Sequence, residues 1–272
     1  MLALDLSGKT AVVTGGVRGV GLGISRAFLE AGAEVVAVAR RAPDRLPEAG
    51  GRTARFVPQD ERDAAAADPF FASLGRVDVL VNNAGGTPFL PVAEGEARTH
   101  ARIIELNLTS ALVMSRAAHA VMTGAGGAGG SIINIGSVSG ARPSPGTAAY
   151  GAAKAGLDSL TASLAVEWAP AIRVNAVTLG MVRTERSHLH YGDEDGVAAV
   201  ARTVPLGRLA DPADAGAACV FLASDLAAYV SGSSLLLHGG GERPAFLDAA
   251  TANRETGRET GHKAPTERTE RP

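Results

Sequence analysis

Tyr150 and Lys154 stand four residues apart in a stretch whose apolar spacing predicts a helix over residues 148–168. Residues four apart on a helix share a face, so the two side chains should lie about one turn from each other. A phenol has a pKa of about 10, and a neighbouring ammonium favours its ionised form. The pair could therefore donate and accept a proton near neutral pH, although most such pairs are solvated surface contacts.

Ser137 and Asn107 could belong to the same chemistry. Ser137 follows the apolar run Ile132–Ile135, which predicts a buried strand, and open α/β sheets bind ligands beyond the carboxyl ends of their strands. Its hydroxyl could hydrogen-bond a carbonyl oxygen and stabilise charge developing there, whereas nearby Ser139 is typical of a turn. Asn107 falls within a predicted helix over residues 98–122, where the ordinary role of an asparagine is a cap or a helix bend.

A glycine-rich segment follows the first predicted strand and runs into a helix over residues 19–31. It reads Thr14-Gly15-Gly16-Val17-Arg18-Gly19-Val20-Gly21. Gly15 allows a sharp turn, Gly19 allows a ligand to approach the backbone, and Gly21 allows close packing of helix on strand. The first N–H groups of a helix favour an anion, so the segment predicts a pyrophosphate-binding loop.

These motifs are joined by apolar runs that alternate with amphipathic segments. Strands are predicted at Thr10–Val13, Glu34–Val38, Ala54–Val57, Val77–Val81, Ser131–Ile135, Arg173–Val177 and Leu235–Leu237, and helices at 19–31, 98–122, 148–168 and 212–222. Apolar strands separated by helices imply a parallel sheet covered on both faces. The sequence predicts a single-domain α/β protein over residues 1–250, with the doubly wound parallel sheet of the Rossmann fold.

Composition excludes several other classes of protein. Hydrophobic residues make up 46% of the 272 residues, and the net charge of −2 offers no attraction to nucleic acid or an anionic membrane. No apolar run approaches the roughly 20 residues of a membrane helix. The single cysteine, Cys219, excludes an internal disulfide, and His188 and His190 lack a third metal ligand at convincing spacing. We expect a cytoplasmic protein with a small-molecule substrate and no metal, nucleic-acid or membrane partner.

Residues 253–272 differ from the rest of the chain. They contain almost no apolar residue and repeat Arg-Glu-Thr-Gly. Such a segment cannot bury enough surface to offset its ordering entropy, so we expect a disordered C-terminal tail.

Taken together, the motifs resemble those of the short-chain dehydrogenase/reductase family. The glycine spacing TGxxxGxG is the variant which that family uses, and Asn82–Gly85, Asn107, Ser137 and Tyr150–Lys154 follow in the family's order, within residues 7–245. The resemblance implies that Asn107, Ser137, Tyr150 and Lys154 form the catalytic set. In such a set Asn107 holds a water that connects Lys154 to solvent, and Lys154 also binds the nicotinamide ribose.

The end of the second predicted strand bears on which nicotinamide cofactor binds. It reads Val38-Ala39-Arg40-Arg41 and lacks the carboxylate that binds the ribose 2′-OH of NAD. A guanidinium suits a 2′-phosphate, so Arg40 favours NADP(H) over NAD(H), unless it is only a solvated strand cap. The resemblance places Arg18 at the same phosphate, Asp60 at the adenine and Asn83 at the adenosine ribose. The expected cofactor-binding residues are Gly15, Arg18, Gly19, Val20, Gly21, Arg40, Asp60, Asn83, Tyr150, Lys154, Gly180 and Thr184.

The expected activity is that of an NADP(H)-dependent carbonyl reductase, which transfers hydride between nicotinamide and a ketone or secondary alcohol. Residues 184–205 resemble the family's substrate lid, and residues 86–90 and 142–145 should frame the pocket with it. Two alternatives stay open: an NAD-dependent alcohol dehydrogenase of the same family, and a module that senses the cofactor without catalysis. The resemblance also implies a homotetramer or homodimer that pairs the helices at 98–122 and 148–168.

Overall fold

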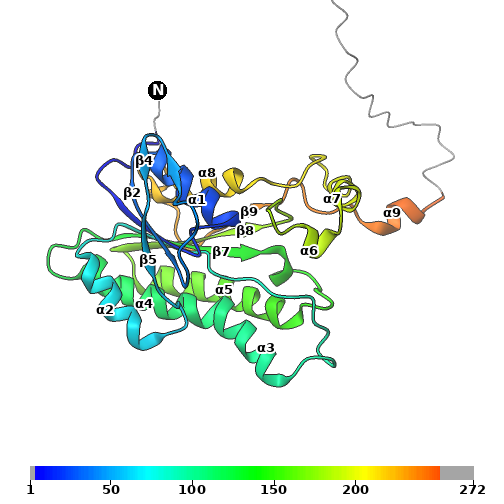
Figure 1. Cartoon of the computed structure of the whole chain (residues 1–272), viewed down its shortest axis with the longest axis horizontal. Coiled ribbons are helices and arrows are strands. Elements are labelled where there is room, and N and C mark those ends of the chain that lie inside the picture. Colours follow the sequence, from blue (N-terminus) through cyan, green and yellow to red (C-terminus); the bar gives the residue numbers. More distant parts are fainter. Residues whose placement is uncertain (1–3, 252–272) are drawn as a thin grey trace, which may run out of the picture.

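The computed structural model describes residues 4–251, and its centre is a seven-stranded sheet in the order β5-β2-β1-β6-β7-β8-β9 (Figure 1). All pairings within this sheet are parallel. The strands are β1 Thr10–Thr14, β2 Glu34–Ala39, β5 Arg55–Pro58, β6 Val79–Asn82, β7 Gly130–Ser137, β8 Ile172–Leu179 and β9 Ser234–Leu237; β3 Glu48–Ala49 and β4 Arg52–Thr53 form a separate hairpin. The doubly wound parallel sheet predicted from the sequence is confirmed. The expected tail at residues 253–272 lies outside the described residues.

Helices cover both faces of the sheet. They are α1 Gly19–Glu30, α2 Ala64–Leu74, α3 Ala97–Ile104, α4 Ser110–Thr123, α5 Ala148–Glu167, α6 His188–Tyr191, α7 Glu194–Ala201, α8 Pro212–Ala223 and α9 Ala245–Ala249. In Figure 1, α1 and α8 lie on one side of the strands, and α2, α4 and α5 lie on the other. This arrangement explains why the central strands are apolar on both faces.

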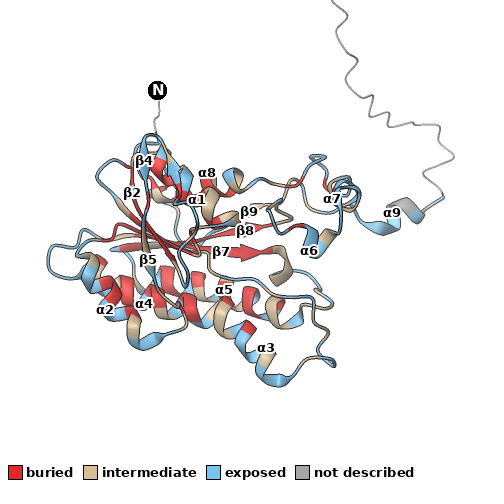
Figure 2. Cartoon of the chain, viewed as in Figure 1, coloured by how far each residue is buried: buried red, intermediate tan, exposed pale blue. Residues whose placement is uncertain are grey.

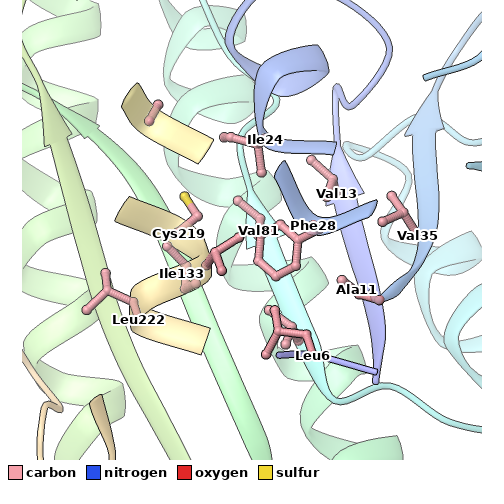
Figure 3. Packing of buried hydrophobic residues seen from close by; sticks show 14 of the residues in the cluster. Leu6, Ala11, Val13, Ile24, Phe28, Val35, Val81, Ile133, Cys219 and Leu222 are labelled. Atoms are coloured by element: carbon pink, nitrogen blue, oxygen red, sulfur yellow. The ribbon is translucent and has the colours of Figure 1, made fainter. Parts of the chain in front are cut away.

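Neighbouring residues of one strand pack into opposite layers of the core, because side chains alternate along a strand. Val12 packs in the layer of α2, α4 and α5, whereas Val13 packs against α1 and α8. Figure 3 shows this second layer, in which Phe28 of α1 and Cys219 of α8 are fully buried. Burial raises the pKa of the Cys219 thiol, so this cysteine is a packing residue.

The helix predicted at residues 98–122 is interrupted in the structure. Residues Ala97–Thr123 form α3, a π-helical turn at Glu105–Thr109, and then α4. A π turn holds one residue more than an α turn, and such turns often occur at functional sites. Asn107 lies at the middle of this turn.

The strands end toward a group of small helices. In Figure 1 the arrow of β7 points to the side on which α6, α7 and α9 lie, and Figure 2 shows these helices to be largely exposed. Val197 of α7 forms a small hydrophobic cluster with Val204 and Leu209, apart from the main core. None of the described helices is long and apolar enough to cross a bilayer, and the cytoplasmic location stays a prediction.

Candidate active site

The glycine loop connects β1 to α1 and leaves room for a ligand against its backbone. Gly15 and Gly19 have φ values of +61° and +50°, in the left-handed region that favours glycine. A Cβ on Gly21 would lie 2.2 Å from the Gly15 carbonyl oxygen, so only glycine fits there. The first turn of α1 carries no acidic side chain, and its free N–H groups suit a pyrophosphate. The loop therefore fits a dinucleotide.

Asn83 fixes the loop after β6 to the loop after β1. Its side-chain amide donates to the Thr14 carbonyl oxygen at 2.8 Å, and its backbone N–H donates to the Thr14 hydroxyl at 2.9 Å. The N–H of Ala84 donates to the same hydroxyl, also at 2.9 Å. These bonds bring the predicted adenosine-ribose residue Asn83 next to Gly15.

Asn107 connects the π turn to the loop after β6. Its amide donates to the carbonyl oxygens of Gly86 and Ile103, each at 2.9 Å, and its side-chain oxygen accepts from the Gly86 N–H at 3.0 Å. A Cβ on Gly85 would lie 2.6 Å from that oxygen and 3.6 Å from Lys154 Nζ. Asn107 and Lys154 thus flank the same glycine.

Lys154 carries a buried ammonium beside Tyr150. Its side chain is 4% exposed and donates to the Ile135 carbonyl oxygen of β7 at 2.7 Å. Nζ lies 5.5 Å from the centre of the Tyr150 ring. Burial lowers the pKa of Lys154 from 10.5 to about 8, and the charge of Asp158, one turn further along α5, opposes that change.

Ser137 is the last residue of β7 and faces Tyr150. It is 9% exposed, and its hydroxyl accepts from the Ser139 N–H at 3.2 Å. Burial raises the pKa of Tyr150, while a hydrogen bond with Ser137 lowers it. The lowered pKa that the sequence predicted for Tyr150 is not found, because desolvation outweighs the other effects on this phenol.

A series of hydrogen bonds between buried side chains connects α5 to the sheet. The Asn82 amide of β6 donates to the Asn134 side chain of β7 at 2.8 Å. The Asn134 amide in turn donates to the Thr161 hydroxyl of α5 at 2.9 Å. Since both donors are fully or almost fully buried, these bonds fix the position of α5 and of the tyrosine and lysine that it carries.

The remaining predicted residues lie at the carboxyl ends of the strands. Gly180 follows β8, and its N–H donates to the Leu237 carbonyl oxygen at 2.9 Å. The Thr184 N–H donates to the Ser187 hydroxyl at 2.9 Å. Arg18 and Arg40 are exposed, beside the glycine loop and at the end of β2. Within residues 4–251, no three His, Cys, Asp or Glu side chains converge where they could hold a metal ion.

Comparisons with known proteins agree with this geometry. A family model described as enoyl-(acyl carrier protein) reductase matches residues 15–242. The cis-4-hydroxycyclohexanecarboxylate dehydrogenase of Sinomonas cyclohexanicum is 40% identical over 243 residues, which cover 85% of this chain and 96% of the relative. A solved structure of a short-chain dehydrogenase/reductase family protein matches with a TM-score of 0.78 and 36% identity over 87% of this chain and 98% of that one.

The chain belongs to the short-chain dehydrogenase/reductase family. It is therefore an oxidoreductase of a family that uses nicotinamide cofactors. A further solved structure, provisionally assigned as an NAD(P)-dependent gluconate 5-dehydrogenase of Beutenbergia cavernae, was determined with NADP bound at low occupancy. It matches this chain with a TM-score of 0.79 and 35% identity, over 88% of this chain and 98% of that one.

After β5, this dehydrogenase/reductase pairs Asp60 with a neighbouring arginine. The Asp60 carboxylate accepts from Arg62 Nε at 2.9 Å and Nη2 at 2.6 Å. This pairing lowers the pKa of Asp60 to about 2. The binding of an adenine by Asp60 stays a prediction, and in this structure its oxygens are engaged by Arg62.

Glu61 is a site residue that the sequence analysis missed. It is 6% exposed, and its carboxylate accepts from the Gly15 N–H of the glycine loop at 3.3 Å. Burial raises the pKa of Glu61, and the positive charge of Arg40 lowers it. The positive charge of Arg40 also lowers the pKa of Asp60, so it acts on two carboxylates. The only sequence signal is that Glu61 adjoins Asp60 after a strand.

The predicted lid region forms one wall of a large groove. The groove has a volume of about 1040 Å³ and runs between α1, residues 183–194 and the start of α8. Gly19 and Thr184 both line it. The lid role of residues 184–205 stays a prediction, and their position beside the glycine loop is compatible with it.

Proposed function

We propose that this protein is an NADP(H)-dependent oxidoreductase that transfers hydride between nicotinamide and a ketone or secondary alcohol. The observation that carries the proposal is the buried Lys154 ammonium beside Tyr150, at the end of the strand that carries Ser137. Burying a charged amine costs free energy, and such costs are concentrated at functional sites. This protein retains that charge next to a phenol in a ligand-binding position of the fold.

Each side chain of the set has a part in the proposed reaction. The bound nicotinamide supplies or accepts the hydride. Ser137 donates a hydrogen bond to the carbonyl oxygen, and Tyr150 transfers its proton to that oxygen as negative charge develops. The raised pKa of Tyr150 keeps the phenol protonated at neutral pH, as a proton donor for carbonyl reduction must be. The Lys154 ammonium stabilises the phenolate that remains, and Asn107, which flanks Gly85 together with Lys154, would hold a relay water.

The groups that would hold the cofactor follow the edge of the sheet. The glycine loop would bind the pyrophosphate, Asn83 the adenosine ribose, and Gly180 and Thr184 the nicotinamide end. Arg40 and Arg18 would bind the 2′-phosphate, which favours NADP(H) over NAD(H). The NADP in the Beutenbergia cavernae structure supports this assignment.

Consumption of NADPH over a panel of ketones tests the activity. We expect the wild type to oxidise NADPH with at least one ketone, and Tyr150→Phe to lose at least about a hundredfold in kcat, in line with the usual contribution of general acid catalysis. Tyr229→Phe is the matched control, because Tyr229 is fully exposed and far along the chain from the set. Equal, slow oxidation by wild type and Tyr150→Phe on every ketone would favour the cofactor-sensing module instead.

Calorimetric titration with NADPH and NADH tests the cofactor preference. The wild type should bind NADPH more tightly, and Arg40→Asp should reverse the order, because a carboxylate repels a phosphate and accepts from a ribose hydroxyl. Tighter binding of NADH by the wild type would refute the preference.

We also propose a homotetramer or homodimer built on α4 and α5. Large apolar side chains are exposed on both helices, Leu112 on α4 and Val166 on α5, and exposed apolar surface often marks an interface. Light scattering that gives the mass of a single 27.5 kDa chain would exclude both assemblies.

A further inference from the structure

A second cavity lies at the carboxyl ends of the last three strands. It has a volume of about 420 Å³, within the usual range for small-ligand sites. Residues that follow β7, β8 and β9 line it, among them Val138, Gly180 and His238. Val138 directly follows Ser137, and Gly180 follows Leu179, which pairs with Ser137 in the sheet. The cavity therefore begins at the residues that directly follow Ser137 and its partner in the sheet.

One ion pair crosses the lining of this cavity. Arg142, five residues after Ser137, lies 2.5 Å from Glu242, five residues after the end of β9. Both residues line the cavity. Their side chains are 43% and 38% exposed, so solvent and solutes reach both of them. The Arg142 guanidinium can bind a carboxylate through paired hydrogen bonds. In this structure the carboxylate that it binds is that of Glu242.

The charges of this ion pair also act on Tyr191 of α6. Burial raises the pKa of Tyr191, and the charges of Arg142 and Glu242 make smaller, opposite contributions to it. Tyr191 in turn acts on Tyr150 and raises its pKa. The geometric link is the cavity itself, because Arg142 and Glu242 line it together with Val138, the residue that follows Ser137.

We propose that Arg142 binds a carboxylate of the substrate and that Glu242 occupies this position until the substrate displaces it. The substrate class is a small oxo acid or hydroxy acid, with its carbonyl or hydroxyl group at Ser137 and Tyr150 and its carboxylate at Arg142. The inference rests on the proposed function, since it names the substrate of the same site.

The structure makes the exchange of partners easy. Exposed ion pairs contribute little to stability, so little is lost when Glu242 leaves Arg142. Glu242 follows Gly239, Gly240 and Gly241, whose φ values are +64°, +95° and +90°. Three successive glycines give the backbone before Glu242 an unusual range of conformations, which allows the carboxylate to move aside.

Binding without turnover gives the first test. Cyclohexanecarboxylate and its uncharged carboxamide are titrated calorimetrically into protein saturated with NADP⁺. We expect the wild type to bind the carboxylate at least about tenfold more tightly, as a charge-assisted bidentate bond provides. Arg142→Gln should abolish this preference, and Glu242→Gln should increase affinity for the carboxylate by up to about fivefold, because the internal competitor is gone.

Arg98→Gln is the matched control. Arg98 belongs to another exposed Arg–Glu pair, formed with Glu96 at the start of α3, and does not line the cavity. Its removal should leave the preference for the carboxylate unchanged. An equal loss in Arg98→Gln and Arg142→Gln, or equal binding of both ligands by the wild type, would overturn the inference.

Reduction of 4-oxocyclohexanecarboxylate and its carboxamide separates this inference from the proposed function. A kcat/KM at least about tenfold higher for the carboxylate, lost in Arg142→Gln mainly through KM, supports both. Equal kcat/KM for the two ketones refutes the carboxylate site and leaves the reductase activity standing. Arg142-dependent binding of cyclohexanecarboxylate with no reduction of any ketone supports the site and refutes the proposed activity.

Discussion

Lys154→Met should change how the stability of the protein depends on pH. The native state holds the Lys154 ammonium almost fully buried, which lowers its pKa from 10.5 to about 8. Methionine fills a similar volume without a charge. It also leaves the Ile135 carbonyl oxygen without its 2.7 Å donor, a cost that does not depend on pH.

The size of this pH dependence follows from the difference between the pKa of Lys154 in the unfolded chain and its pKa in the native state. Below about pH 8 both the native and the unfolded chain hold the proton, and the native state carries the full cost of the buried charge. Between about pH 8 and 10.5 the unfolded chain binds more protons than the native one, so wild-type stability rises with pH. At 1.36 kcal/mol per pKa unit, the gain is about 3 kcal/mol.

Urea unfolding of both proteins at several pH values measures this gain. The free energy of unfolding of Lys154→Met minus that of the wild type should fall by about 3 kcal/mol between about pH 7 and pH 10.5. Titrating groups that do not interact with Lys154 are common to both proteins and cancel in the difference. When Asp158→Asn is added to both proteins, this fall in the difference should begin at lower pH, because the charge of Asp158 raises the pKa of Lys154. A difference that stays constant with pH would refute the reasoning.

Three other variants test the cofactor end and the π turn. Glu61→Gln removes a negative charge that interacts electrostatically with Arg40 but keeps an oxygen for the Gly15 N–H. The NADPH-to-NADH affinity ratio should therefore rise about fivefold, or about 1 kcal/mol, in a calorimetric titration, and an unchanged ratio would contradict this role. Gly21→Ala places a Cβ 2.2 Å from the Gly15 oxygen, and it should lower Tm and weaken NADPH binding at least about tenfold, for an overpacking cost of about 1–3 kcal/mol. Asn107→Ala leaves the Gly86 N–H and carbonyl without their partner and should cost about 2–3 kcal/mol in urea unfolding; a loss below about 0.5 kcal/mol would mean that water replaces the amide.

The central strands could be predicted from the sequence because their residues are apolar on both faces. Val12 and Val13 pack into opposite layers, and such a strand gives a continuous apolar run. The ends of the strands were less predictable from the sequence. β8 continues through Thr178 to Leu179, two residues beyond the predicted end, because pairing with β7 and β9 does not depend on hydrophobicity.

The residues of the candidate site could be named, but their environment could not. The raised pKa of Tyr150 results from burial, which the four-residue spacing to Lys154 does not determine. Glu61 reaches a backbone N–H that lies 46 residues away along the chain. Arg142 and Glu242 are 100 residues apart and meet only because β7 and β9 end at the same edge. Contacts of this kind depend on tertiary structure and leave no pattern in the local sequence.

The π turn at Glu105–Thr109 determines the direction in which each later side chain of α4 points around the helix axis. One additional residue in a helix turns every later side chain by about 100° around the axis. The face of α4 that carries Met114 and Met122 points into the core only with that extra residue in place. The same insertion thus places Asn107 against Gly86 and aligns a hydrophobic stripe with the sheet. A single-residue deletion there would move both, so this short stretch should tolerate substitution far better than changes in length.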